Sequence, residues 1–175
     1  YQKISMESKK CILIINGGSS SIKYAIYKVE EPLMPVSSGE IAGIGNGKAQ
    51  FSFTELNSDQ NNHISIDTEN HTEASDWLAN WLKTEIDFTK IIAVGHRIVQ
   101  GMAHTEPQEI TDKLFEQLKS ISSFDPEHLP AELSLITVFK KHFPEANHVA
   151  CFDTSFHTNM PDVAKLIPIP QKYRD

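Results

Sequence analysis

Residues 11–21 read CILIINGGSSS, and this stretch decides the fold. Five apolar residues are followed by Asn16, two glycines and three serines, and residues 22–29 then alternate between apolar and polar side chains. An apolar run that ends in a glycine-rich turn and continues as an alternating segment predicts two strands joined by a tight turn. The chain therefore opens with an antiparallel strand pair.

More short strands are expected at residues 38–45, 49–56 and 62–67, with glycine- and asparagine-rich turns between them. The three glycines of residues 43–47 have the spacing of a nucleotide-binding loop. Because they precede a strand rather than a helix, they predict a hairpin turn instead.

Farther along, apolar side chains recur at helical spacing and alternate with short apolar runs. The pattern predicts helices at 72–86, at 111–120 and from 129 to just before Pro144, with strands at 91–94 and 147–152. We expect the acids and proline of residues 125–127 to form the first turn of the last helix. The order of elements predicts a mixed α/β sheet whose later strands, joined through helices, run parallel.

The composition limits the classes of protein to which the chain can belong. Its 175 residues include 23 acidic and 16 basic side chains, giving a net charge of −7. This balance argues against a nucleic-acid-binding module, which needs a basic face. No apolar run approaches the roughly 20 residues needed to cross a bilayer, so no membrane partner is expected. Cys11 and Cys151 lie in apolar runs and are expected to be reduced core residues, which indicates the cytoplasm.

Three apolar strands each end on an unusual polar residue: Asn16, Arg97 and Asp153. If the strands are parallel, their carboxyl ends share one edge of the sheet, where ligands bind in open α/β folds. The alternative is that each residue is a separate surface or capping residue. Three such residues at equivalent strand ends favour a common cleft.

The loop at residues 16–21 could cradle an anion with its backbone N–H groups and hydroxyls, and Lys23 lies just beyond it. It is neither a Walker A sequence nor a nucleophile elbow, and by itself it fits a hairpin turn equally well. The eight histidines show no zinc-binding spacing. Asp153 acting with phosphate oxygens on a hard cation such as Mg²⁺ fits better.

Three blocks of the sequence together resemble the acetate kinases, the acetokinase family. They are IINGGSSSIK at 14–23, VGHRIVQG at 94–101, and CFDTSFH at 151–157 with Met160-Pro161 behind it. The resemblance implies a ribonuclease H-like α/β fold, a mixed sheet with flanking helices, as the first half of a duplicated two-domain kinase. It further implies a tail or cloning remnant at 1–10, a kinase domain at 11–155, and a linker with the start of a second domain at 156–175.

The family transfers a phosphoryl group from its co-substrate ATP to the carboxylate of acetate, with Mg²⁺ or Mn²⁺, giving acetyl phosphate and ADP. The resemblance implies that Arg97 binds acetate and the transferring phosphoryl group, and that Asp153 is the catalytic carboxylate. Val99 would line the pocket for the acetate methyl group, and His128 would also bind substrate. The residues implied in binding ATP phosphates are Asn16, which would also contact the metal, and Gly18, Ser19, Ser21 and Lys23.

Two departures from the family pattern stand out. Residues 125–132 read DPEHLPAE where the family has Pro-Leu-His-Asn-Pro-Ala-Asn, and the chain stops at Asp175 where the family continues for another domain. The isolated chain is therefore expected to be inactive, and the full-length protein is expected to be a homodimer. The alternatives are a propionate or butyrate kinase of the same family and a non-catalytic nucleotide- or phosphate-binding domain on this fold.

Overall fold

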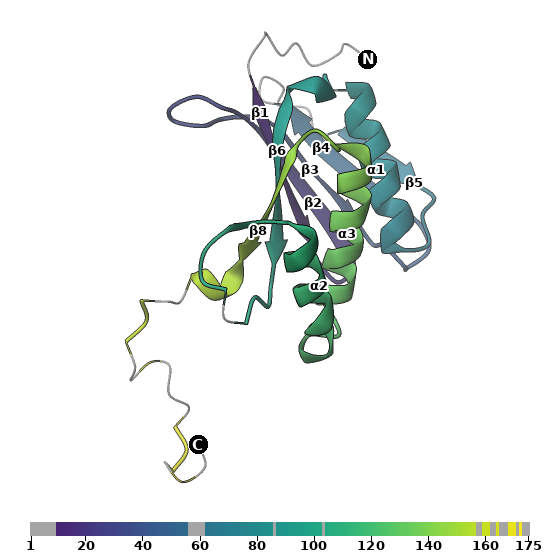
Figure 1. Cartoon of the computed structure of the whole chain (residues 1–175). Coiled ribbons are helices and arrows are strands. Elements are labelled where there is room, and N and C mark those ends of the chain that lie inside the picture. The colour runs from purple at the N-terminus through teal and green to yellow at the C-terminus, as the bar shows by residue number, and fades with distance from the viewer. Residues whose placement is uncertain are drawn as a thin grey trace.

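The computed structural model describes residues 10–55, 62–85, 87–102, 104–156, 159–161, 164, 168–170 and 172. Within them, eight strands form one mixed sheet in the order β5-β4-β3-β2-β1-β6-β8-β7. The helices lie together on one face of this sheet (Figure 1). None of the helices in the described residues is long and apolar enough to span a membrane.

The first five strands form the antiparallel half of the sheet, each paired with the next. They are β1 (Cys11–Gly17), β2 (Ser21–Lys28), β3 (Met34–Ala42), β4 (Ala49–Glu55) and β5 (Asn62–Ile66). The predicted strand pair at residues 11–29 is therefore confirmed. The glycines at 43, 45 and 47 all have positive φ, between 78° and 102°, which confirms a turn between β3 and β4 that glycine adopts without strain.

The second half of the chain alternates helices and strands and adds the parallel part of the sheet. Its elements are α1 (His71–Glu85), β6 (Ile91–Ile98), β7 (Gln108–Glu109), α2 (Asp112–Ser120), α3 (Leu129–His142) and β8 (Asn147–Phe152), with short 3₁₀ turns at 88–90, 122–124 and 153–155. Strand β6 lies between β1 and β8 and runs parallel to both, as predicted. This arrangement brings the carboxyl ends of β1, β6 and β8 to one edge.

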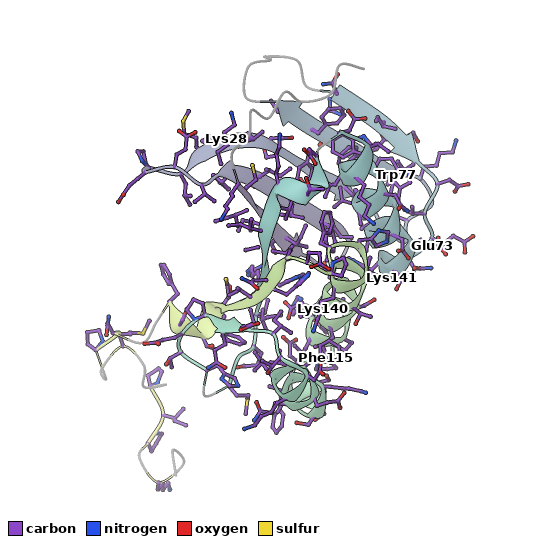
Figure 2. All side chains as sticks on the ribbon, turned by 45° about the horizontal axis from the view of Figure 1, so that its top comes forward. Lys28, Glu73, Trp77, Phe115, Lys140 and Lys141 are labelled. Atoms are coloured by element: carbon purple, nitrogen blue, oxygen red, sulfur yellow. The ribbon has the colours of Figure 1, made fainter. Side chains whose placement is uncertain are left out.

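The main core lies between the sheet and the helices. Alternate side chains of β1 and β2 are buried there, and an aromatic cluster extends the core toward β4. The Phe51 ring contacts those of Tyr24, Phe53, Trp77 and Trp81 at centroid distances of 4.7 to 6.2 Å. The two tryptophans reach the cluster from α1, where Figure 2 shows Trp77. Both tryptophans are half-buried and pack against the core.

The opposite face of the sheet is less covered within the described residues. Ile14 on β1 and Cys151 on β8 are exposed there, because side chains alternate between the two faces of a strand. The prediction that both cysteines are core residues is therefore wrong for Cys151 and confirmed for Cys11. Ala150 and Phe152, the strand neighbours of Cys151, occupy the helix-covered side and are buried.

Several element boundaries differ from the sequence-based expectations. Helix α3 begins at Leu129, so residues 125–127 precede it rather than form its first turn. Asp125 has φ −139° and ψ 70°, because a residue before proline is disfavoured in the helical region. Strand β3 begins at Met34, earlier than expected, and its pairing with β2 shifts register near Pro35. The expected helix end at Ile86, the N-terminal tail and most of 156–175 lie outside the described residues.

Two buried histidines join β6 to β8. His96 Nε2 lies 3.0 Å from His148 Nδ1, and His148 Nε2 lies 3.1 Å from the carbonyl oxygen of Phe143. The Phe143 carbonyl can only accept, so His148 donates from Nε2 and accepts the Nε2–H of His96 at Nδ1. This pattern needs one proton on each ring, and the buried Nδ1 of His96 has no partner in the described residues to accept a second one. Burial, with smaller contributions from His148 and Lys140, lowers the pKa of His96 to about 3.

We expect this neutral pair to make the fold sensitive to acid. Below pH 6.5 the unfolded chain binds a proton at residue 96 that the folded chain takes up only near pH 3. The free energy of unfolding should therefore fall by up to about 1.4 kcal/mol per pH unit from this group as the pH decreases through that window. Denaturant unfolding of the wild type and of His96→Gln between pH 7 and 4 measures the effect. The variant should show the shallower slope, and equal slopes would contradict the assignment.

Candidate active site

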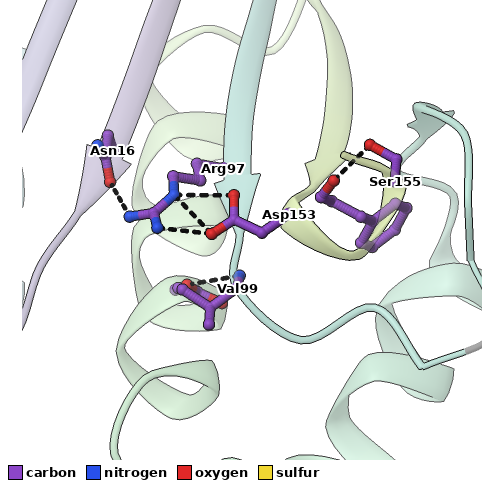
Figure 3. A network of polar contacts seen from close by, with 7 residues as sticks. Asn16, Arg97, Val99, Asp153 and Ser155 are labelled. Atoms are coloured by element: carbon purple, nitrogen blue, oxygen red, sulfur yellow. Dashed lines mark hydrogen bonds and ion pairs between the residues drawn. The ribbon is translucent and has the colours of Figure 1, made fainter. Parts of the chain in front are cut away.

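Asn16, Arg97 and Asp153 meet at the carboxyl edge of the parallel strands. Arg97 Nε lies 2.9 and 3.0 Å from the two carboxylate oxygens of Asp153, and its Nη2 donates to Oδ2. Nη1 of the same guanidinium donates to Asn16 Oδ1 at 3.1 Å, as Figure 3 shows. The three polar strand ends therefore form one hydrogen-bonded group rather than three separate surface residues.

The guanidinium of Arg97 is held in a fixed orientation but stays accessible. Asp153, through its hydrogen bonds and charge, raises the pKa of Arg97 further above its already high value, so the side chain keeps its charge. The Arg97 and Asp153 side chains remain 42% and 40% exposed. A guanidinium has five N–H donors, and the contacts with Asn16 and Asp153 leave one on each Nη. Arg97 can therefore bind an incoming anion through two donors.

The serine loop between β1 and β2 is a tight hairpin turn beside Asn16. The Gly18 N–H donates to the Ser21 carbonyl oxygen at 2.8 Å, which closes the turn. His71 Nε2 lies 2.9 Å from the Ser19 carbonyl oxygen, so the first residue of α1 supports the loop. The Ser19 side chain is exposed. The geometry thus places the loop next to the strand-end group, and its role in phosphate binding stays a prediction.

Close packing fixes the start of this loop. A Cβ atom on Gly17 would collide with the Leu135 side chain of α3. The missing side chain at Gly17 lets the Leu135 methyl group pack directly against the end of β1. The end of β1 that carries Asn16 is therefore positioned directly by α3.

Lys23 adds a positive charge to the same edge. It lies directly opposite Asn16 in the β1–β2 register, and residues paired in this way project from the same face of a sheet. Its Nζ is 3.7 Å from Glu40 Oε1 on β3, in an exposed ion pair. Exposed pairs of this kind bind weakly, so Lys23 can exchange Glu40 for a ligand anion.

Val99 and His128 lie differently with respect to the strand-end group. Val99 immediately follows β6, is half-buried, and donates its N–H to Glu132 Oε1 at 3.1 Å. His128 occupies the N-cap position of α3, where its backbone bonds to Asp125 and Glu132. Within the described residues, its imidazole makes no hydrogen bond to Asn16, Arg97 or Asp153. His128 is therefore not joined to the strand-end group by a hydrogen bond, and its implied role in substrate binding stays a prediction.

Sequence reasoning missed Glu132. Its side chain is only 3% exposed and reaches from the first turn of α3 to the end of β6. The sequence held one signal of this position. Glu132 lies at helical spacing from Leu129 and Ile136 and next to Leu133, on the apolar face of the helix. An acid on that face is rarely buried without a specific partner.

The side-chain oxygens of Asn16 and Asp153 can bind Mg²⁺ together with the phosphates of a ligand. Within the described residues, no cluster of three or more His, Cys, Asp or Glu side chains could hold a metal ion by itself. Mg²⁺ is commonly held by one or two carboxylates together with substrate phosphates. Asp153 and Asn16 supply oxygen ligands of the right kind, so this edge fits a magnesium–phosphate complex rather than a metal cage.

Comparison with known proteins shows the family of the chain. Residues 11–175 match the acetokinase family. The chain belongs to this family. The acetate kinase of Mycoplasmoides gallisepticum is 36% identical over 167 residues, an alignment that covers 94% of this chain and 42% of the relative.

Solved structures in the family share the fold. A crystal structure of the Porphyromonas gingivalis acetate kinase matches with a TM-score of 0.79 and 26% identity. A propionate kinase from Francisella tularensis matches with a TM-score of 0.76 and 27% identity. Each alignment covers 93% of this chain and 42% of the solved chain. The chain therefore shares the fold of the matched portion of these kinases and spans about two fifths of their length.

Proposed function

We propose that the full-length protein is an acetate kinase, which transfers the γ-phosphoryl group of ATP to a carboxylate oxygen of acetate. The observation that carries the proposal is the Arg97 guanidinium, held by Asp153 and Asn16 at the carboxyl edge of the sheet in a member of the acetokinase family. A fixed, accessible guanidinium matches the paired oxygens of a carboxylate or a phosphoryl group. Arg97 therefore binds both reacting anions.

The reaction needs positioning and charge neutralisation more than covalent help from the protein. An acetate oxygen attacks the γ-phosphorus as the bond to the bridging oxygen of ADP breaks. Arg97 draws the two anions together and offsets the charge on the equatorial oxygens. Asp153 fixes the plane of the Arg97 guanidinium, and Asn16 holds its other end.

The ATP phosphates lie against the β1–β2 loop in this proposal. Ser19 and Ser21 offer backbone N–H groups and hydroxyls, and Lys23 offers a positive charge at the same edge. The N–H of Gly18 closes the turn, and its lack of a side chain lets the loop backbone come close to the phosphates. Asn16 and Asp153 would hold Mg²⁺, which neutralises phosphate charge when it is bound. Val99 lines the pocket for the acetate methyl group, and His128 completes the substrate site from the start of α3.

We extend the proposal to the rest of the protein. Residues 11–155 are the first kinase domain, 156–175 begin the second, and the complete enzyme is a cytoplasmic homodimer. The two cysteines of the chain are too few for the disulfide framework of a small secreted protein, and this count and the use of ATP support the cytoplasm. Size-exclusion chromatography with light scattering tests the dimer.

We expect the purified full-length protein to form acyl phosphate from ATP, Mg²⁺ and acetate, measured as the hydroxamate. Propionate and butyrate should serve with lower kcat/KM, because the pocket at Val99 discriminates each methylene by roughly 1–3 kcal/mol. Equal or higher kcat/KM for propionate would assign the protein to the second candidate, propionate kinase, the class of the matched Francisella tularensis structure. No activity on any short carboxylate would overturn the kinase proposal.

A further inference from the structure

Glu132 is a buried carboxyl group directly beneath the candidate site. It lies in the first turn of α3, is 3% exposed, and its Oε1 accepts the N–H of Val99 at 3.1 Å. Its second oxygen, Oε2, is buried and has no hydrogen-bond partner in the described part of the chain. A buried carboxylate usually satisfies both oxygens, so the unpartnered Oε2 requires an explanation.

The charges that face Glu132 come from three segments. Asp125 lies in the turn before α3, Arg97 near the end of β6, and Asp153 directly after β8, and each acts electrostatically on Glu132. The Arg97 guanidinium is already paired with the Asp153 carboxylate. The Oδ2 atom of Asp125 is itself buried and without a partner. Glu132 is thus a second carboxyl group acting on a guanidinium that already has Asp153 as its ion-pair partner, and Asp125 adds a further negative charge close to Glu132.

We propose that Glu132 is a positioning residue of the Arg97 site. Glu132 holds the Val99 amide as an uncharged carboxyl group, and it favours anion binding at Arg97 for as long as it keeps its proton. The proton lies on Oε2, since Oε1 accepts the amide hydrogen. In this form Glu132 fixes the backbone two residues beyond Arg97 without adding negative charge. The identity of the anion as acetate or phosphate rests on the proposed function.

Electrostatics favour the same protonation state. Burial is the main influence and raises the pKa of Glu132 to about 7, with Asp125 and Asp153 adding to the rise and the Val99 N–H and Arg97 opposing it. Below this pH the carboxyl is neutral. Above it, ionisation places a negative charge next to the position where the substrate anion must bind.

Anion binding and protonation are therefore linked in both directions. A bound anion at Arg97 favours the proton on Glu132, and the proton on Glu132 favours the anion by the same factor. Because the group loses its proton as the pH rises through about 7, the affinity for the anion should decrease over that range. Acetate itself stays ionised throughout, so its own titration does not contribute.

Steady-state kinetics of the full-length protein test this link. The KM for acetate is measured from pH 6 to 8.5 at saturating MgATP for the wild type, Glu132→Gln and Glu127→Gln. Glutamine keeps an oxygen for the Val99 N–H but cannot ionise. Glu127 is an exposed glutamate just before α3 and serves as the matched control.

The wild type and Glu127→Gln should show a KM that rises roughly fivefold or more across this range, whereas Glu132→Gln should show a nearly constant KM. A purely structural role for Glu132 would not remove the pH dependence. A Glu132→Gln profile that rises like that of the wild type overturns the proposal.

A second measurement does not depend on catalysis. The carboxyl carbons of the 175-residue chain are labelled with ¹³C at glutamate and followed by NMR as the pH changes, and the Glu132 resonance is identified by its loss in Glu132→Gln. A titration midpoint near 7 supports the proposal. A midpoint near 4, the ordinary value for glutamate, overturns it even if the full-length protein proves to be an acetate kinase. A midpoint near 7 in a protein without kinase activity would instead overturn only the proposed function.

Discussion

Replacing Arg97 with alanine is expected to lower kcat/KM of the full-length protein for acetate by roughly 10³-fold or more. Losses of this size follow when a single charged or hydrogen-bonding group that stabilises transition-state charge is removed. In this site the loss has two parts. The cation that binds the reacting anions disappears, and the Asp153 carboxylate, now without its partner, repels them. Steady-state kinetics with acetate and ATP measure the effect.

Arg97→Lys is the informative control for this prediction. Lysine keeps the positive charge but cannot contact Asp153 and Asn16 with one planar group. Its kcat/KM should fall between those of the wild type and Arg97→Ala. Because the side chain is 42% exposed, neither variant should lower the melting temperature strongly. An alanine variant with more than a third of the wild-type kcat/KM would remove Arg97 from the site.

The second large effect is expected in folding. Phe51→Ala should lower the free energy of unfolding of the 175-residue chain by about 3–5 kcal/mol, as is typical for a buried phenylalanine. Phe51 is fully buried, and its ring contacts four other aromatic rings that join β2 and β4 to α1. The substitution leaves a cavity at the centre of that cluster, which the surrounding rings cannot fill.

Denaturant unfolding measures this loss, and Phe124→Ala provides the matched control. Phe124 is 67% exposed, so its truncation should change the free energy of unfolding by no more than about 0.5 kcal/mol. A loss below 1 kcal/mol for Phe51→Ala, or equal losses for the two variants, would contradict a core centred on the aromatic cluster.

The sequence predicts the arrangement of the strands well, because local patterns carry that information. The apolar run and serine turn at 11–21 specify the first strand pair, and the alternation of helices and strands after residue 71 specifies the parallel pairs with β6. The convergence of Asn16, Arg97 and Asp153 follows from that topology alone, since parallel strands present their carboxyl ends at one edge.

Other features depend on contacts that no local pattern encodes. Cys151 sits in an apolar run like Cys11, and its exposure depends on which face of the sheet the helices cover. The β7 strand has two residues and pairs only because the chain returns to the edge of β8. The burial of Glu132 and the position of the His128 imidazole depend on α3 beginning at Leu129, so that residues 125–127 precede the helix instead of forming its first turn. All of these features depend on tertiary packing between segments that are far apart in the sequence.

We propose that Arg97 lies in a site for phosphoryl transfer to acetate, and this role can be measured. It is tested most directly by incubating the full-length protein with [γ-³²P]ATP, Mg²⁺ and acetate and following labelled acetyl phosphate over time. Label should appear in this acid-labile product with the wild type, and at least a hundredfold more slowly with Arg97→Ala. Absence of the labelled product with the wild type, or equal rates for the two proteins, would contradict it.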